Sequence, residues 1–196
     1  WGASIGIASI EDLNRTLDEG KGIELINICE AHQERKYAAL ANKIFLRKGE
    51  ARIVMISGPS SSGKTSSSLR IAQQCRVLGL NPKVIELDNY FVDRDRTPKD
   101  ENGEYDFESL HAMDLDMLNS HLNSLLKGET VEIPRYDFKA GTHRFEGHCI
   151  TLGENDILVM EGIHALNPEM TSSVDASRIF KVYVSALTAL KTGEEG

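Results

Sequence analysis

Residues 58–65, "GPSSSGKT", constrain this 196-residue chain more than any other stretch. They fit the phosphate-binding pattern G-x-x-x-x-G-K-[ST], which joins a buried strand to a helix. The flanks agree, because residues 51–57 are an apolar run typical of a buried strand and residues 63–79 have a helical pattern. These flanks disfavour the alternative, a flexible serine-glycine linker. The motif therefore predicts a domain that binds a nucleoside triphosphate.

The composition of this loop suits an anion. Small residues let backbone N–H groups curl around a phosphate, and the helix that follows directs its positive end at the same place. Lys64 adds a charge for the β- and γ-phosphates, and the Thr65 hydroxyl is a ligand for magnesium. The predicted nucleotide-binding residues are Gly58, Ser60, Ser61, Ser62, Gly63, Lys64, Thr65 and Ser66.

Charge and composition narrow the classes of protein to which the chain can belong. A net charge of −8 disfavours a nucleic-acid groove, and no apolar run of about 18 residues predicts a membrane span. The first residues lack the features of a signal peptide, and the missing initial Met indicates a fragment. Cys29, Cys75 and Cys149 lie far apart without metal-binding spacing. We therefore expect buried reduced thiols in a cytoplasmic protein.

The order of elements predicts the fold. Residues 1–50 form an expected helical arm, with Ser9 and Asp12 as the start and Gly20 as the end of its first helix. Residues 51–196 form an expected P-loop kinase domain. Strands are expected at 51–57, 83–88, 131–134, 156–160 and 178–185, helices at 9–20, 22–48, 63–79 and 112–127, and a hairpin at 136–152. This alternation predicts an α/β fold with a mostly parallel sheet covered by helices on both faces.

Two carboxylates follow expected strands. In open parallel sheets, ligands bind where the strands end, so Asp88 and Glu161 belong to the edge that carries the phosphate loop. We expect Asp88 to accept the proton of an attacking hydroxyl and Glu161 to orient magnesium. A purely structural role, such as capping a turn, is the alternative for each.

Two short motifs combine aromatic and charged residues. "IPRYDF" and "GEYDFESL" place rings beside acids, which suits a planar ligand with hydroxyl groups. Ordinary core or hairpin packing is the alternative. The mixed-charge loop at 89–110 either is solvated or covers an acceptor.

The motifs "GPSSSGKTS", "LDNYF", "YDFESLHAMDLDML", "GETVEIPRYDF", "MEGIHALNP" and "VYVSALT" together resemble the uridine kinase/phosphoribulokinase family. The resemblance covers residues 51–190, and the helical arm is similar to the connector of a long bacterial subfamily with TGS-like and threonyl-tRNA-synthetase-like N-terminal regions. It implies ATP and Mg²⁺ as cofactors, and transfer of the γ-phosphate to the 5′-hydroxyl of uridine or cytidine. Two alternatives stay open: a kinase of a sugar phosphate or other hydroxyl metabolite, and a nucleotide-binding regulatory module linked to translation. The oligomeric state stays open too.

The resemblance also implies residue roles. Asp88 and Lys64 would be catalytic, and Thr65 and Glu161 would hold magnesium. The implied acceptor-binding residues are Phe91, Phe107, Glu108, Arg135, Tyr136, Phe138 and His143. Phe91 stands where uridine kinases often have Tyr, and Glu108 stands where they have Asp.

The family continues into an arginine-rich helix and lid. No counterpart follows Leu190, so we expect a kinase domain that is incomplete at its C-terminus. Arg94, Arg96 and Arg135 are then the candidates within this chain for stabilising charge on the transferred group.

Overall fold

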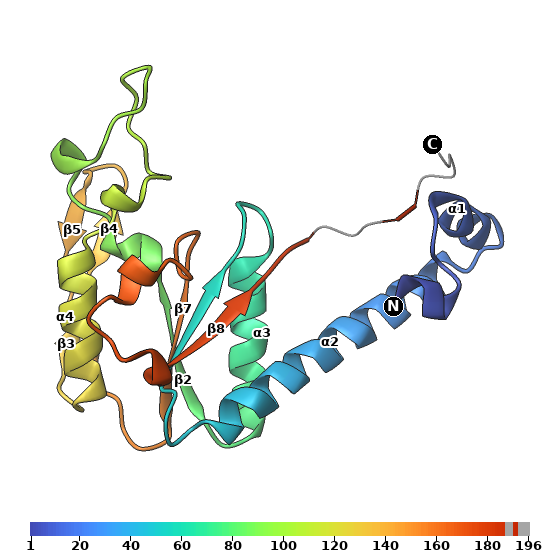
Figure 1. Ribbon diagram of the computed structural model, residues 1–196, viewed down its shortest axis with the longest axis horizontal. Coiled ribbons are helices and arrows are strands. Elements are labelled where there is room, and N and C mark those ends of the chain that lie inside the picture. The colour runs from blue at the N-terminus through green and yellow to red at the C-terminus, as the bar shows by residue number, and fades with distance from the viewer. Residues whose placement is uncertain (187–189, 192–196) are drawn as a thin grey trace. The chain divides into compact units, whose positions relative to one another are not determined.

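A computed structural model describes residues 1–186, 190 and 191 of the chain. It divides into two compact units, one formed by Trp1–Tyr37 with Ala186–Gly196 and the other by Ala38–Ser185 (Figure 1). Helix α1 (Ile10–Asp18) lies in the first unit, and α2 (Gly22–Leu46) begins there. No helix in the described part of the chain is long and apolar enough to cross a membrane.

Helix α1 begins as its sequence predicts. The Ser9 hydroxyl accepts a hydrogen bond of 3.2 Å from the backbone N–H of Asp12, and the Asp12 carboxylate accepts one of 3.1 Å from the N–H of Ser9. This reciprocal pair satisfies donors that a helix start leaves free. Gly20 follows the helix with φ of 74°, in the left-handed region where glycine is favoured.

The second unit is built on a four-stranded sheet. Its strands are β1 (Ile53–Ser57), β2 (Asn81–Glu86), β7 (Asp156–Glu161) and β8 (Ile179–Tyr183). They run parallel in the order β2-β7-β1-β8. Two short antiparallel pairs join β3 (Val131–Glu132) to β6 (Cys149–Ile150) and β4 (Arg135–Asp137) to β5 (Thr142–Arg144). The predicted mostly parallel α/β fold is confirmed.

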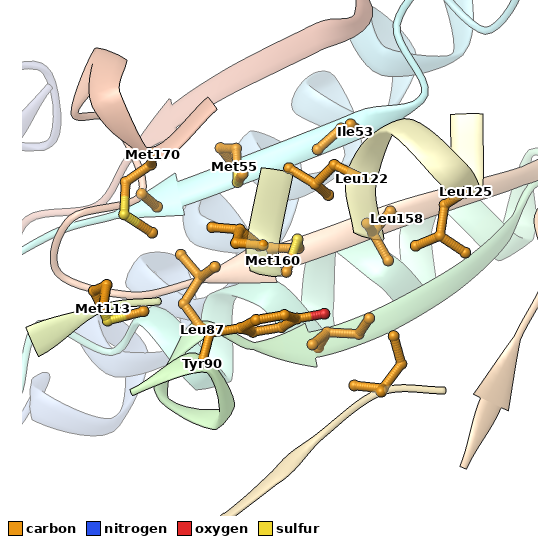
Figure 2. Packing of buried hydrophobic residues seen from close by; sticks show 14 of the residues in the cluster. Ile53, Met55, Leu87, Tyr90, Met113, Leu122, Leu125, Leu158, Met160 and Met170 are labelled. Carbon is orange, nitrogen blue, oxygen red and sulfur yellow. The ribbon is translucent and has the colours of Figure 1, made fainter. Parts of the chain in front are cut away.

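Helices cover both faces of this sheet, as predicted. Helix α3 (Lys64–Val77) contacts β1, β2 and β7, and α4 (Leu115–Leu126) lies on the other side of the sheet in Figure 1. Ile53 and Met55 of β1 share one buried cluster with Leu122 and Leu125 of α4 (Figure 2). Burial of this cluster holds the strands of the sheet in place. The positions of the strand ends, where the candidate site residues lie, follow from it.

Three local predictions need correction. Strand β2 ends at Glu86 instead of residue 88, because the buried side chains of Leu87 and Tyr90 turn the chain into a short 3-10 helix, η2 (Leu87–Tyr90). Asp88 therefore lies on η2. Helix α4 begins at Leu115 instead of 112, since the Asp114 carboxylate caps it by accepting 2.9 Å from Met117 N–H. Finally, Cys75 is buried, but Cys29 and Cys149 are exposed.

Candidate active site

The phosphate-loop motif adopts a tightly turned backbone between β1 and α3. A side chain at Gly58 would place its Cβ 2.2 Å from the carbonyl oxygen of Val184, so this position requires glycine. Gly63 has φ of 83°, and Ser61, with φ of 58°, is the one non-glycine residue with positive φ in the described part of the chain. Strained backbone of this kind is typical of ligand-binding loops. The Ser62 Oγ is buried without a hydrogen-bond partner among described residues.

The loop leads directly into the first turn of α3. The first N–H groups of a helix have no partner within it, and they carry the positive end of its dipole. Lys64 reaches back across the loop, where its Nζ donates to the carbonyl of Pro59 over 2.9 Å. Thr65 and Ser66 are exposed in this turn, as are Ser60 and Ser61 in the loop. The arrangement fits an anion with several phosphate oxygens.

A hydrogen bond between two side-chain oxygens links α3 to the end of β7. The Thr65 hydroxyl donates to Oε1 of Glu161 over 2.5 Å. Glu161 is 7% exposed, so its carboxylate is fixed in place. Magnesium prefers oxygen ligands and binds through one or two protein groups plus phosphates. These two residues fit that ion, although ninety-six positions separate them in the sequence.

Asp88 lies on the same edge of the sheet. Its side chain is accessible to solvent, yet surrounding protein atoms remove enough water to raise its pKa above the ordinary value. The nearby carboxylates of Glu161 and Glu86 raise the pKa of Asp88 further, and Lys64 opposes them. A carboxylate with a raised pKa is a better proton acceptor than an ordinary one.

Aromatic residues gather next to Asp88. The ring of Phe91 lies 5.3 Å from that of Phe107, 5.6 Å from Tyr136 and 6.0 Å from Phe138, between centroids. The His143 ring lies 5.8 Å from Tyr136, its partner in the pairing of β4 with β5. These five residues, the aromatic cluster, come from three separate segments that the sequence analysis selected.

A narrow hollow connects Asp88 to this cluster. Its volume is about 10 Å³, close to the space of one water molecule or hydroxyl group. Asp88 lines it together with Phe91, Phe107, Ile163 and His164. The carboxylate and the aromatic cluster therefore share one small space.

Two polar atoms in the aromatic cluster lack a hydrogen-bond partner within the part of the chain that the structure describes. Tyr136 Oη and His143 Nε2 are buried, and neither forms a hydrogen bond with a described residue. A buried polar atom without a partner costs free energy of about 1–3 kcal/mol. Such atoms are expected where a ligand supplies the missing hydrogen bonds.

Asp93 supports the aromatic cluster at His143, and the sequence analysis missed this residue. Its Oδ1 accepts 2.6 Å from the Thr142 hydroxyl and 3.3 Å from the His143 backbone N–H, and it lies 3.9 Å from His143 Nδ1. The bond from Thr142 is the main reason that the pKa of Asp93 is lowered. The only sequence signal was its place two residues after Phe91, inside a stretch of mixed charge.

The structure does not bring the predicted arginines into the hollow. Arg135 is exposed, lies 3.4 Å from Glu146, and lines a separate cavity of about 410 Å³. Arg94 donates to the backbone carbonyl of Phe138 and packs against Gly141, so it supports the hairpin. Arg96 lies on a short 3-10 helix near Asp93.

Glu108 is exposed on the loop before α4, and its backbone carbonyl meets His164 Nε2 at 2.6 Å. His164 is a second residue that the sequence analysis missed. Its place three positions after Glu161 is the signal that could have found it.

Comparison with known proteins places these features in a family. Residues 53–193 match the model of the "Phosphoribulokinase / Uridine kinase family". A uridine kinase from Macrococcus caseolyticus is 32% identical over 67% of this chain and 61% of its own length. A uridine kinase from Oceanobacillus iheyensis is 31% identical over 71% of this chain and 63% of its own length. The chain thus spans about three fifths of these relatives.

One solved structure has a similar fold. It is described as a possible uridine kinase from Bacillus stearothermophilus, with a TM-score of 0.56 and 24% identity. The match covers 76% of this chain and 79% of that one. At this identity the likeness concerns the fold alone.

Proposed function

Because the chain belongs to the phosphoribulokinase/uridine kinase family, we propose that it is an ATP-dependent kinase of a pyrimidine nucleoside, uridine or cytidine. One observation carries the proposal: Asp88 lines the same hollow as Phe91 and Phe107. A nucleoside presents a hydroxyl group and a planar ring at opposite ends. A carboxylate beside aromatic rings is complementary to both.

The phosphate loop and helix α3 form the part of the proposed site that binds ATP. The backbone N–H groups at the start of α3 and the Lys64 ammonium bind the triphosphate. Thr65 and Glu161, whose oxygens meet at 2.5 Å, would hold magnesium. When bound, the ion neutralises charge that develops between the β- and γ-phosphates.

The reaction at the acceptor end is a proton transfer coupled to substitution at phosphorus. The 5′-hydroxyl oxygen forms a bond to the γ-phosphorus, and the bond from that phosphorus to the leaving oxygen of ADP breaks. The hydroxyl proton goes to Oδ of Asp88. The hollow of about 10 Å³ has room for the hydroxyl but not for a sugar ring, so the ring and base lie toward the aromatic cluster.

Binding of the pyrimidine base would explain why Tyr136 Oη and His143 Nε2 lack hydrogen-bond partners among the described residues. A pyrimidine carries both N–H or NH₂ donors and carbonyl acceptors on its edge. Tyr136 Oη can donate or accept, and His143 Nε2 does one or the other according to its tautomer. Hydrogen bonds to the base would satisfy both atoms. Because the two atoms are buried, the base reaches them only after the surrounding side chains move.

A panel of acceptors with MgATP tests this function. Uridine, cytidine, purine nucleosides, pentose phosphates and glycerate are each incubated with the protein, and products are identified by mass spectrometry. We expect uridine or cytidine 5′-monophosphate, and loss of product with the variant Asp88→Asn. Phosphorylation of a sugar phosphate but no nucleoside would overturn the nucleoside assignment. Nucleotide binding without transfer to any acceptor would favour a regulatory module.

A further inference from the structure

His164 forms a hydrogen bond that the proposed reaction does not yet explain. Its Nε2 lies 2.6 Å from the backbone carbonyl oxygen of Glu108, fifty-six positions away in the sequence. We propose that His164 is a positioning residue, which holds residues 104–110 against the acceptor site so that Phe107 and Glu108 meet the nucleoside. This inference rests on the proposed function.

The direction of the bond fixes the state of the imidazole ring. A backbone carbonyl can only accept, so the proton of the bond must be on Nε2 of His164. In the neutral ring, Nδ1 then carries the lone pair. The proposal therefore requires one tautomer of His164, which can be measured independently of any activity.

The His164 end of the bond is anchored to the sheet. The Ser57 hydroxyl, at the end of β1, donates 2.7 Å to the carbonyl of Ile163, and Gly162 N–H donates 3.1 Å to the carbonyl of Ile56. A Cβ on Gly162 would lie 2.9 Å from the Cβ of Leu87, so the turn is closely packed. His164 thus projects from a rigid support.

The loop end is ordered around Glu108. The Asp106 carboxylate accepts 3.0 Å from Glu108 N–H and 3.1 Å from Ser109 N–H. Both backbone groups of Glu108 are therefore bonded, one to Asp106 and one to His164. With both groups held, the backbone at Glu108 is fixed, and so is the point from which the neighbouring Phe107 side chain starts.

The position of the loop matters for the acceptor, because His164 also lines the hollow beside Asp88. Phe107 lines the same hollow and contacts Phe91 at 5.3 Å between ring centroids. Releasing the loop would let Phe107 leave the aromatic cluster. The phosphate loop has no part in this contact, so the expected effect concerns the acceptor and not ATP.

Substitutions of His164 separate this role from a general structural one. In His164→Ala the acceptor KM should rise by about two- to tenfold, the range for one lost hydrogen bond, with the MgATP dissociation constant unchanged. His164→Gln should restore KM to within about twofold, because the Gln amide nitrogen has a reach similar to Nε2. His164→Asn, whose amide corresponds to Nδ1, should behave like His164→Ala. His148→Ala, at an exposed histidine of the separate cavity, is the matched control.

Two measurements test the bond without catalysis. ¹⁵N NMR should show the Nε2-protonated form of His164, and hydrogen exchange of residues 104–110 should speed up in His164→Ala but not in His164→Gln. An Nδ1-protonated neutral ring, or unchanged KM and exchange in His164→Ala, would overturn the inference. If the acceptor panel identifies another substrate, the nucleoside assignment fails and the same KM comparison is made with that substrate.

Discussion

The Thr65 hydroxyl and the Glu161 carboxylate meet at 2.5 Å, between the first turn of α3 and the end of β7. Parallel pairing of β1 with β7 brings them together, since Ile56 of β1 is the register partner of Glu161. The phosphate loop starts where β1 ends, so the same pairing places Glu161 beside the nucleotide. This relationship makes the pair the candidate magnesium site.

The magnesium site can be tested with two substitutions of the same residue. Thr65→Val keeps the volume and removes the hydroxyl, whereas Thr65→Ser keeps the hydroxyl. The Mg²⁺ concentration for half-maximal kinase rate should rise about 10- to 100-fold in the valine variant and little in the serine variant. Equal magnesium dependence in both variants would remove Thr65 from the metal site.

Lys64 is expected to contribute directly to nucleotide affinity. In this structure its Nζ donates to the Pro59 carbonyl, a bond that it can exchange for a phosphate oxygen. Lys64→Ala should weaken MgATP binding about 10- to 100-fold, the range of a charge-assisted hydrogen bond, and abolish transfer. Calorimetric titration measures the affinity, with Lys83→Ala on β2 as the control. Unchanged affinity together with unchanged turnover would contradict the phosphate-loop assignment.

Asp88 is expected to act on turnover rather than on ATP binding. Asp88→Asn keeps the shape and removes the proton acceptor, so the turnover number should fall about 10²-fold or more. The MgATP dissociation constant should stay within a few-fold of the parent. A variant that phosphorylates as fast as the parent would show that another group takes the proton.

The raised pKa of Asp88 also predicts an effect on stability. Desolvation and the nearby Glu161 and Glu86 carboxylates make the charged form of Asp88 unfavourable in the folded state. Above the raised pKa, Asp88→Asn should therefore have a higher Tm than the parent. As the pH falls through that pKa, the parent becomes neutral and the difference should shrink. Thermal melts from pH 7 to pH 4 measure it, and a constant difference would contradict the raised pKa.

Sequence patterns predicted the fold and most candidate site residues for definite physical reasons. The phosphate loop has a fixed spacing, and carboxylates after buried strands must reach one edge of a parallel sheet. Asp93 and His164 were missed, because the hydrogen bonds that distinguish them go to hairpin and loop backbone far along the chain, and their only sequence signals were their places beside Phe91 and Glu161. The separation of Arg135 from Tyr136 follows from β4, where neighbouring side chains point to opposite faces.

Two tyrosines near Phe91 give the last test: Tyr90, which precedes it in the sequence, and Tyr136, whose ring contacts it. The Tyr136 hydroxyl is buried and forms no hydrogen bond with a described residue, whereas the Tyr90 hydroxyl lies 3.1 Å from His121 Nδ1. Tyr136→Phe should therefore keep or raise the Tm of the ligand-free protein, and Tyr90→Phe should lower the free energy of unfolding by about 1–3 kcal/mol. With the nucleoside added, the Tm of Tyr136→Phe should fall below that of the parent, since the missing hydroxyl reduces the stabilisation that the acceptor provides. Melting curves with and without uridine measure both effects. Equal stabilisation by uridine in the parent and Tyr136→Phe would remove Tyr136 from the base site.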